Sequence, residues 1–306
     1  MEGLITKSTG KLYLVRCNDG AIVNCSIKGS FRLKGSVSTN PLAVGDRVEF
    51  DYEENEKVGV IKTLLERKNY IIRKSINLSR KSQIIAANID MAYLIVSLFD
   101  PRTPLGFIDR FLVTAEAYRI PITIVFNKRD LADKEALEFL NELMQLYKDI
   151  GYDCISISAY NTYDVNKIKE LMNHRINLFS GQSGVGKTTL LNAIVPSLNL
   201  KTGSISKAHA KGVHSTTFAE LFEINNDTFI LDTPGIRDFG MYDFKKEEVS
   251  HYFPEMLKIL NGCRFNNCLH VNEPDCAVKK AVEEGRIHAS RYYNYLSILN
   301  GEDNYK

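Results

Sequence analysis

Two hydrophobic patterns divide the chain. Up to about residue 68, short runs of alternating apolar and polar residues are separated by glycine and by charge, as in residues 11–15, 21–25 and 47–50. Short strands that recur every ~8–12 residues are typical of a small β-barrel or sandwich. We favour a barrel of OB type, and an SH3-like barrel is the alternative that this pattern leaves open.

From Ile84 onward, apolar strands alternate with apolar residues at helical spacing. This alternation predicts an α/β fold with an open, mostly parallel sheet and right-handed crossovers. After Gly240 the strand pattern stops, so we expect three domains, over residues 1–68, 69–240 and 241–306. The expected strands are 89–98, 122–126, 154–158, 176–179, 218–224 and 228–231, and the expected helices are 108–118, 137–147 with Gly151 as C-cap, 165–174 and 277–299.

The segment with the strongest chemical signal, Gly181 to Thr188, matches G-x-x-x-x-G-K-[ST] in full. It lies between an apolar strand and a helical run, where glycines let backbone N–H groups converge on phosphate oxygens. Lys187 would bring positive charge to the β- and γ-phosphates, and Thr188 a hydroxyl to Mg²⁺. The nucleotide-binding residues expected here are Gly181, Gln182, Ser183, Gly184, Val185, Gly186, Lys187, Thr188 and Thr189.

A second motif, N-K-x-D at Asn127-Lys128-Arg129-Asp130, indicates which base is bound. The carboxylate of Asp130 can accept hydrogen bonds from guanine N1–H and the N2 amino group, a donor pair that adenine lacks. Lys128 can lie along the base, and Asn127 can tie this loop to the phosphate loop. After the next strand, Ser158 and Ala159 stand where a second base-contacting loop belongs.

A third motif, D-x-x-G, follows the strand 228–231. Asp232 can hold Mg²⁺ through water and the Gly235 N–H can sense the γ-phosphate. In the polar segment 212–217, either Thr216 or Thr217 can close over Mg²⁺ as a switch. Ile236 stands where many GTPases have a water-orienting glutamine, so His214 is the nearest candidate catalytic group, or else a loop residue or RNA contact.

The order of these motifs is unusual. Ordinary GTPases run from the phosphate loop through the switch threonine and D-x-x-G to N-K-x-D, whereas here N-K-x-D comes first, at residue 127, and the phosphate loop follows at 181. The same sheet can form if the usual ends are joined through the helix expected at 165–174 and new ends open after Gly235. The sequence therefore predicts a circularly permuted P-loop GTPase domain.

Half of the six cysteines lie within a short span that also holds a histidine: Cys263, Cys268, His270 and Cys276. Three thiolates and one imidazole suit a closed, tetrahedral, structural Zn²⁺ site. A group of free thiols with a bystander histidine is the alternative. The nearby Arg264, Lys279, Lys280, Arg286, Arg291, Tyr292, Tyr293 and Tyr295 can serve RNA or form an ordinary helix surface.

Composition adds limits. The chain has 306 residues, of which 44% are hydrophobic, and a net charge of +2, so RNA binding would depend on local patches. One such patch is the run 66–83, with six Lys or Arg and a single acid; it is either a solvated connection or a strip along a phosphate backbone. No stretch approaches the ~18 apolar residues of a membrane span, and the first residues do not read as a secretory signal. We expect a cytoplasmic protein.

Taken together, these motifs resemble the RsgA family of small ribosomal subunit biogenesis GTPases, over nearly the whole chain. The resemblance rests on the permuted order, the basic run leading into 85–90, the segments 212–217 and 232–240, and the cysteine spacing. It implies an OB domain, a permuted GTPase domain and a helical zinc domain. The family's switch segment usually reads Gly-Arg-His-Thr-Thr-Thr; here Val213 and Ser215 differ, while His214 matches the histidine proposed to assist hydrolysis.

The resemblance also implies a function. It implies binding of the small (30S) ribosomal subunit and its rRNA, assistance in late subunit maturation, and subunit-stimulated hydrolysis of GTP to GDP with Mg²⁺. We expect a monomer without membrane contacts. The alternative is a GTP-dependent RNA-binding switch that acts in translation, and a metabolic P-loop kinase is disfavoured by N-K-x-D.

Overall fold

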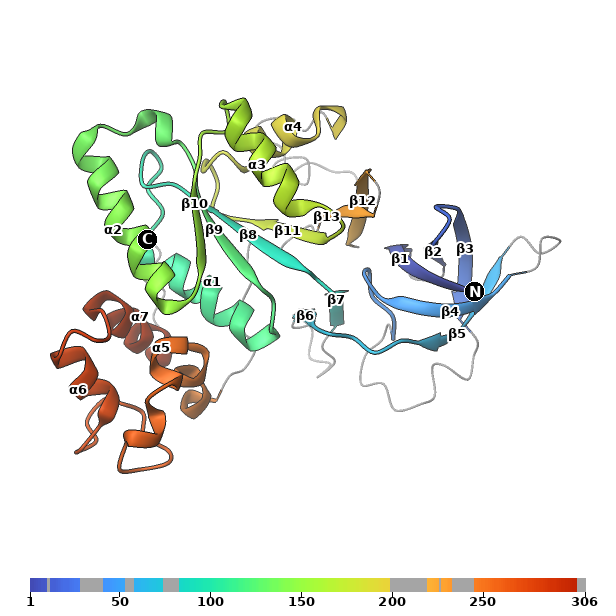
Figure 1. The fold of residues 1–306 in the computed structure, drawn as a ribbon. Helices are drawn as coiled ribbons and strands as arrows, with labels where there is room; N and C mark the ends of the chain where they lie inside the picture. Colours follow the sequence, from blue (N-terminus) through green and yellow to red (C-terminus); the bar gives the residue numbers. More distant parts are fainter. Residues whose placement is uncertain are drawn as a thin grey trace, which may run out of the picture.

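A barrel, a helix-covered sheet and a helical C-terminal region follow one another along the molecule (Figure 1). The structure, a computed structural model, describes residues 1–9, 12–27, 41–52, 58–73, 83–198, 219–225, 227–232 and 245–301. Of Arg73, Gln83 and Asp232 it describes the backbone alone.

The first five strands close into a barrel. Their order is β1-β2-β3-β5-β4, and β4 returns to pair with β1. β3 and β5 run parallel, and the other neighbours are antiparallel. Tyr13, Val15 and Cys17 of β2 are buried and alternate with half-buried residues, as the sequence pattern predicts. The strands are β1 (Glu2–Ser8), β2 (Tyr13–Cys17), β3 (Ile22–Ile27), β4 (Arg47–Asp51) and β5 (Gly59–Leu64).

The central sheet has the order β10-β9-β8-β11-β13-β12. Neighbouring strands are parallel from β10 to β13, and β12 joins β13 antiparallel. The mostly parallel sheet expected from the sequence is thus confirmed. Its strands are β8 (Met91–Val96), β9 (Ile122–Phe126), β10 (Asp153–Ser156), β11 (Ile176–Ser180), β12 (Glu220–Asn225) and β13 (Thr228–Asp232).

Helices cover both faces of this sheet, which explains why its strands are continuously apolar. Along β8, Leu94 belongs to the core under the first pair of helices, α1 and α2. The next residue, Ile95, belongs to the core under the second pair, α3 and α4. The helices are α1 (Leu105–Tyr118), α2 (Lys134–Ile150, with Gly151 as C-cap), α3 (Thr162–Met172) and α4 (Lys187–Ile194), followed by the short η3 (Pro196–Leu198).

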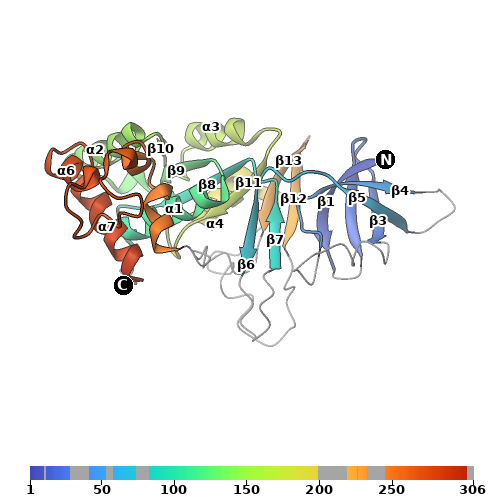
Figure 2. The ribbon, with the colours of Figure 1, turned by 90° about the horizontal axis from the view of Figure 1, so that it is seen from below.

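The barrel continues the central sheet, because β1 lies beside β12 (Figure 2). Lys7 pairs with Glu220 across this junction, and their side chains form an ion pair of 2.8 Å. Arg16 of β2 reaches the β12–β13 hairpin, where its guanidinium contacts Glu223 of β12 at 2.6 Å and Asp227 of the turn at 2.7 Å. The barrel is therefore tied by charge to the hairpin that ends in Asp232.

Of the six basic side chains in the run 66–83, the structure describes those of Arg67 and Lys68, which form ion pairs with Asp46 and Asp90. The ends of the run form an antiparallel ribbon of β6 (Tyr70–Arg73) and β7 (Gln83–Ala87). Arg67 donates to both oxygens of the buried Asp46 carboxylate, at 2.6 and 2.7 Å. Its charge is therefore paired with a residue of the barrel rather than with solvent or phosphate. Lys74, Arg80 and Lys81 lie outside the described residues.

One glycine fixes how closely the barrel approaches this ribbon. Gly45 has φ +90°, and a Cβ there would lie 2.0 Å from the carbonyl oxygen of Ala87. The amide of Asn88 donates to the Gly45 carbonyl at 2.9 Å, and Asn69 exchanges two hydrogen bonds of 2.8 Å with the backbone of Ile89. Backbone and amide contacts thus join the barrel, the ribbon and the central sheet.

The C-terminal region consists of short helices, and the single helix expected over 277–299 is wrong. Gly285 adopts φ +71° and ends the first helix, and His288 caps the second by accepting a hydrogen bond from the Ser290 N–H. Ile287, between them, is buried. The elements are η5 (Lys246–Tyr252), α5 (Pro254–Leu257), η6 (Leu260–Gly262), α6 (Ala277–Glu283) and α7 (Ala289–Asn300).

A buried charge network attaches this region to the central domain. Arg291 of α7, only 1% exposed, donates to Asp109 of α1 at 2.6 Å and to Glu255 of α5 at 2.7 Å. Tyr147 of α2 donates to the same Asp109 oxygen at 2.8 Å, and Asn294 donates to the other. The Arg291 guanidinium also lies over the Phe253 ring, 4.6 Å from its centroid. Each of these polar groups is compensated, as burial requires.

Removing one charge from this network should destabilise the protein strongly. Asp109→Asn leaves a buried guanidinium with one carboxylate instead of two, and losing a partner of a buried pair costs about 3–5 kcal/mol. We expect a clearly lower midpoint of urea denaturation, followed by circular dichroism. Glu284→Gln, which breaks exposed contacts with Arg286 and Lys280, is the control and should change stability by about 0.5 kcal/mol or less. Equal midpoints for the two variants would contradict the assigned importance of Asp109.

Candidate nucleotide site and metal centre

The phosphate loop connects β11 to α4. Its glycines are required by close backbone approaches: a Cβ on Gly181 would lie 2.2 Å from the carbonyl oxygen of Ile95, and one on Gly186 would lie 2.3 Å from the Asn127 amide. Gly186, at φ +91°, is the N-cap of α4, so the helix begins at Lys187 with its amino end facing the loop. That end favours phosphate through its free N–H groups and its dipole.

The side chains of the loop are arranged around this turn. Val185 is fully buried and anchors the loop, whereas Ser183 is exposed and Gln182 is half-buried. Lys187 reaches back across the loop and donates to the Gly181 carbonyl at 2.8 Å. Thr188 and Thr189 are half-buried in the first turn of α4. The ammonium of Lys187 is therefore held at the mouth of the loop, where a phosphate chain would lie.

One buried amide joins three motif segments. Asn127 is 3% exposed; its Nδ2 donates to the Val185 carbonyl at 2.9 Å, and its Oδ1 accepts from the Ala159 N–H at 3.1 Å. The tie between N-K-x-D and the phosphate loop, expected from the sequence, is present in the structure. The second tie, to the Ser158–Ala159 loop, was not anticipated.

The remaining residues of N-K-x-D lie in and before the short helix η2 (Arg129–Leu131). Lys128 has φ +66° and donates through Nζ to the carbonyl of Asp100, on the loop after β8. That loop also flanks the phosphate loop, because a Cβ on Gly184 would lie 2.8 Å from Pro101 Cγ. Asp130 is exposed.

Arg129 has an unexpected position. Its guanidinium donates to the Ser156 carbonyl and to Asp164 of α3, both at 2.8 Å, and Asp164 also accepts from the Ser158 N–H at 2.9 Å. We expected Arg129 among the nucleotide-binding residues only because it fills the variable position of N-K-x-D. Asp164 was not among the residues expected from the sequence. A signal was available, since Asn161 starts α3 as a capping residue and leaves Asp164 near the helix N-terminus.

All four motif segments follow the carboxyl ends of adjacent or nearby parallel strands, the usual place for ligands in open α/β sheets. β9 leads to Asn127, β10 to Ser158, β11 to Gly181, and β13 ends at Asp232. The strand order agrees with a permuted domain. β9 and β10, which lead to N-K-x-D and to Ser158, precede β11, which leads to the phosphate loop, and with β8 they lie on one side of it. The candidates His214, Thr216, Thr217 and Gly235, together with Ile236, lie outside the described residues.

The four predicted metal ligands come together in the C-terminal region. One donor atom from each of Cys263, Cys268, His270 and Cys276 lies within 4.8 Å of the others. His270 Nδ1 is 3.3 Å from Cys276 Sγ and 3.6 Å from Cys263 Sγ. A tetrahedral Zn²⁺ with Zn–S and Zn–N bonds of ordinary length would separate such atoms by about 3.6 Å. The donor set therefore fits zinc, with Nδ1 as the imidazole ligand.

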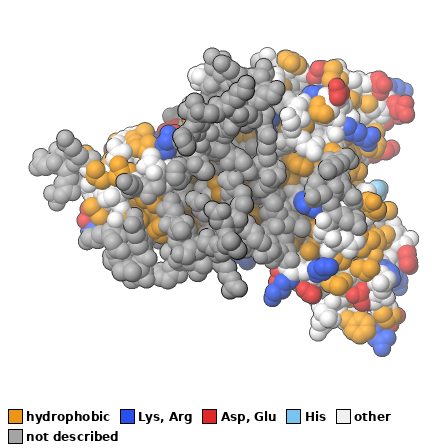
Figure 3. Space-filling model, turned by 180° about the vertical axis from the view of Figure 1, so that it is seen from behind, with side chains coloured by type: hydrophobic (Ala, Val, Ile, Leu, Met, Phe, Trp, Pro, Cys, Tyr) orange, Lys and Arg blue, Asp and Glu red, His pale blue; other side chains and the backbone are white. Residues whose placement is uncertain are grey.

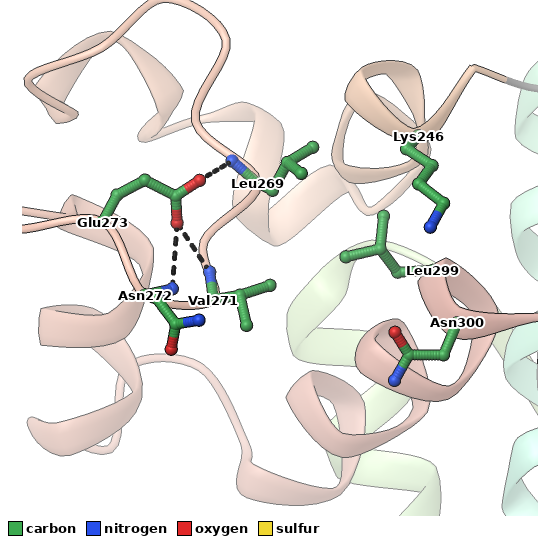
Figure 4. A pocket seen from close by; sticks show the side chains of 7 residues that line it. All are labelled: Lys246, Leu269, Val271, Asn272, Glu273, Leu299 and Asn300. Atoms are coloured by element: carbon green, nitrogen blue, oxygen red, sulfur yellow. Dashed lines mark hydrogen bonds between the residues drawn. The ribbon is translucent and has the colours of Figure 1, made fainter.

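The surroundings of these ligands are consistent with a metal centre. Burial raises the pKa of the Cys268 thiol to about 12 and lowers the pKa of His270, so thiolates here need a compensating cation. The loop backbone is fixed by Glu273, which accepts from the N–H groups of Leu269, Val271 and Asn272 (Figure 4). Tyr292 donates to the His270 carbonyl at 2.6 Å. His270 Nε2, in contrast, is buried without a partner among the described residues.

A cavity of about 460 Å³ opens beside this centre (Figure 4). None of the phosphate-loop residues lines it, so it is separate from the nucleotide site. Its lining consists of Lys246, Leu269, Val271, Asn272, Glu273, Leu299 and Asn300.

The structure divides the basic and aromatic residues near the cysteines into buried and exposed ones. Arg291 and Tyr295 are buried, and so belong neither to an RNA contact nor to an ordinary helix surface. The exposed Arg264 and Arg286 face Asp275 and Glu284. On the face that Figure 3 shows, basic and acidic side chains of the C-terminal region are interspersed. No helix in the described ranges is long and apolar enough to span a bilayer.

Comparison with known proteins agrees with this geometry over the whole chain. The sequence patterns of the RsgA N-terminal domain and the RsgA GTPase match residues 2–61 and 64–242. The small ribosomal subunit biogenesis GTPase RsgA of Christiangramia forsetii is 52% identical, over 100% of this chain and 98% of its own.

Two solved structures are also similar. YjeQ from Thermotoga maritima is 33% identical with a TM-score of 0.80 and covers 100% of this chain and 99% of its own. YloQ, described as a circularly permuted GTPase, is 28% identical with a TM-score of 0.76 and covers 100% of this chain and 96% of its own. With its permuted motif order, its barrel and its Cys₃His cluster, this GTP-hydrolysing chain belongs to the RsgA GTPase family.

Proposed function

We propose that this GTPase acts in the cytoplasm, as a monomer, on the small (30S) ribosomal subunit. It binds the rRNA of the subunit late in maturation and hydrolyses GTP to GDP and phosphate faster when bound. The support is the relatives' printed name, which assigns them to small ribosomal subunit biogenesis, together with similarity over the full chain.

The observation that carries the proposal is that both outer parts of the molecule are attached to elements that frame the nucleotide site. Arg16 ties the barrel to the β12–β13 hairpin, and β13 ends at Asp232. Arg291 ties the C-terminal region to α1, which follows the loop that carries Asp100 and Pro101 beside the phosphate loop. A ribosomal contact on either side therefore has a direct mechanical path to the nucleotide.

We assign roles to the site residues from their placement. Lys187 and the N–H groups at the start of α4 hold the phosphates, while Thr188 and Asp232 serve Mg²⁺. Asp130 accepts from guanine, and Lys128 and the Ser158–Ala159 loop flank the base. Thr216 or Thr217 completes the Mg²⁺ site, Gly235 senses the γ-phosphate, and His214 assists the attacking water where Ile236 cannot. Zn²⁺, held by the Cys₃His cluster, has a structural role.

The base assignment predicts a switch of specificity. Asp130→Asn replaces an acceptor pair with an amide that can donate to O2 of xanthine, so the variant should bind GTP more weakly and prefer XTP. Calorimetric titration with both nucleotides measures this preference. Asp149→Asn, on the far end of α2, is the matched control and should keep the preference for GTP. An Asp130→Asn protein that still favours GTP would remove Asp130 from base recognition.

The metal assignment predicts one tightly held Zn²⁺ per chain in protein purified without chelator. Cys276→Ser removes a ligand and should lower both the zinc content and the melting temperature, because structural zinc contributes to folding. Cys154→Ala, which changes a buried cysteine of β10, should keep one Zn²⁺. Elemental analysis that finds no zinc in the unaltered protein would contradict the site.

The coupling predicts that intrinsic hydrolysis is slow and that the small subunit accelerates it, as partner-ordered switches do by ~10³–10⁵-fold elsewhere. His214→Ala should keep nucleotide affinity and lose most of the stimulated rate. Arg16→Gln should keep the intrinsic rate and lower the stimulation, because it loosens the barrel from the β12–β13 hairpin. Turnover is measured alone, with small subunits and with large subunits.

Each comparison has an outcome that opposes the proposal. Equal stimulation by the two subunits would indicate a non-specific effect of RNA. Stimulation that survives in His214→Ala would mean that the ribosome supplies the group that assists the water.

A further inference from the structure

Guanine recognition depends on how two loops are held, and the variable residue of N-K-x-D holds them. The backbone N–H of Arg129 donates to the Ile157 carbonyl at 3.0 Å, and its guanidinium donates to the Ser156 carbonyl at 2.8 Å. Main chain and side chain of one residue thus fasten the loop after β9 to the loop after β10. Asp130, the next residue, is exposed.

Asp164 provides the other half of this connection. Its side chain is 6% exposed, and its Oδ2 accepts both from Arg129 at 2.8 Å and from the Ser158 N–H at 2.9 Å. The start of α3 does not need this carboxylate, because Asn161 accepts from the N–H groups of Tyr163 and Asp164. Asp164 is therefore available to the two loops, and its charge is compensated by Arg129.

The carboxylate of Asp130 makes no hydrogen bond within the part of the chain that the structure describes, so its position follows from the backbone that Arg129 fixes. The opposite loop is fixed at Ser158 by Asp164 and at Ala159 by the Asn127 amide. Two loops, separated in sequence by a helix and a strand, thereby acquire one defined spacing.

We propose that Arg129 and Asp164 form a positioning pair that sets the distance between Asp130 and the Ser158–Ala159 loop, and through it the selectivity for guanine. Neither residue contacts the nucleotide in this scheme. The inference rests on the proposed role of Asp130 as the carboxylate that reads the base. Truncating Arg129 leaves a buried carboxylate without its cation, and Asp164 would then pull the Ser158 loop towards solvent or accept a proton.

Base selectivity separates positioning from general stability. Inosine diphosphate lacks the 2-amino group that Asp130 would accept from, while its phosphates and sugar are those of GDP. Arg129→Gln and Asp164→Asn should each weaken GDP binding by about 5- to 30-fold. They should weaken inosine diphosphate binding by a smaller factor, because that base keeps the N1–H and lacks only the 2-amino donor, so the ratio of the two affinities falls. The double variant should lose no more than the worse single variant, because the two residues act as one unit.

The measurement is calorimetric titration of the full-length protein with GDP and with inosine diphosphate. Arg286→Gln, which breaks an exposed contact with Glu284 by the same substitution, is the control and should keep the affinity ratio. Loss of affinity for both nucleotides by the same factor, or an unchanged ratio in Arg129→Gln, would overturn the inference. If Asp130→Asn prefers XTP while Arg129→Gln keeps the ratio, this inference alone falls; if Asp130→Asn keeps its preference for GTP, the base-site assignment falls with it.

Discussion

The nucleotide site depends on one buried side chain, the amide of Asn127. Its nitrogen binds the phosphate loop at Val185 and its oxygen binds the Ser158 loop at Ala159, segments 58 and 32 residues away in the chain. An amide can do both at once because it carries a donor and an acceptor on one rigid plane. Gly186 has to be a glycine for the same reason, since any Cβ there would occupy the place of this amide. The conformation of the phosphate loop and the position of the loops proposed to recognise the base thus depend on the same side chain.

Ion pairs hold the parts of the molecule in place, and in two of the three the carboxylate is buried. Asp46 accepts Arg67, Asp109 accepts Arg291, and Glu223 with Asp227 accepts Arg16. The pairs of Asp46 and Asp109 are directional, and desolvation makes a misplaced partner costly there. The Asp109–Arg291 pair therefore defines how the C-terminal region sits on the central sheet more sharply than apolar contact alone. Arg67 is held by the barrel, Arg291 by helices and Arg16 by the hairpin. Each arginine therefore fixes the position of a different part of the molecule.

Much of the fold was predictable because its signals are local. The strand pattern of 122–126 and the phosphate loop at 181–188 each lie within one short segment. The four metal ligands lie within a span of fourteen residues, a spacing typical of zinc sites. The roles of Arg67, Arg129 and Arg291 were not predictable. A charged residue in a sequence suggests exposure, and only the position of a distant acid shows which partner holds it. The break between α6 and α7 was missed because Gly285 and His288 interrupt a pattern whose apolar spacing continues across them.

The joining of β1 to β12 has a consequence for synthesis on the ribosome. Arg16 and Glu223, which meet at this junction, are 207 residues apart. The barrel is complete at Leu64 and its partner hairpin at Asp232, so at usual rates of translation the barrel exists for about 8–34 s before the hairpin is made. An open sheet edge waiting that long would invite aggregation. Here β1 is already paired on both sides, with β2 and β4, and offers β12 little more than the end at Lys7. The closed barrel therefore exposes little free strand edge for aggregation during the time before β13 is made and completes the sheet.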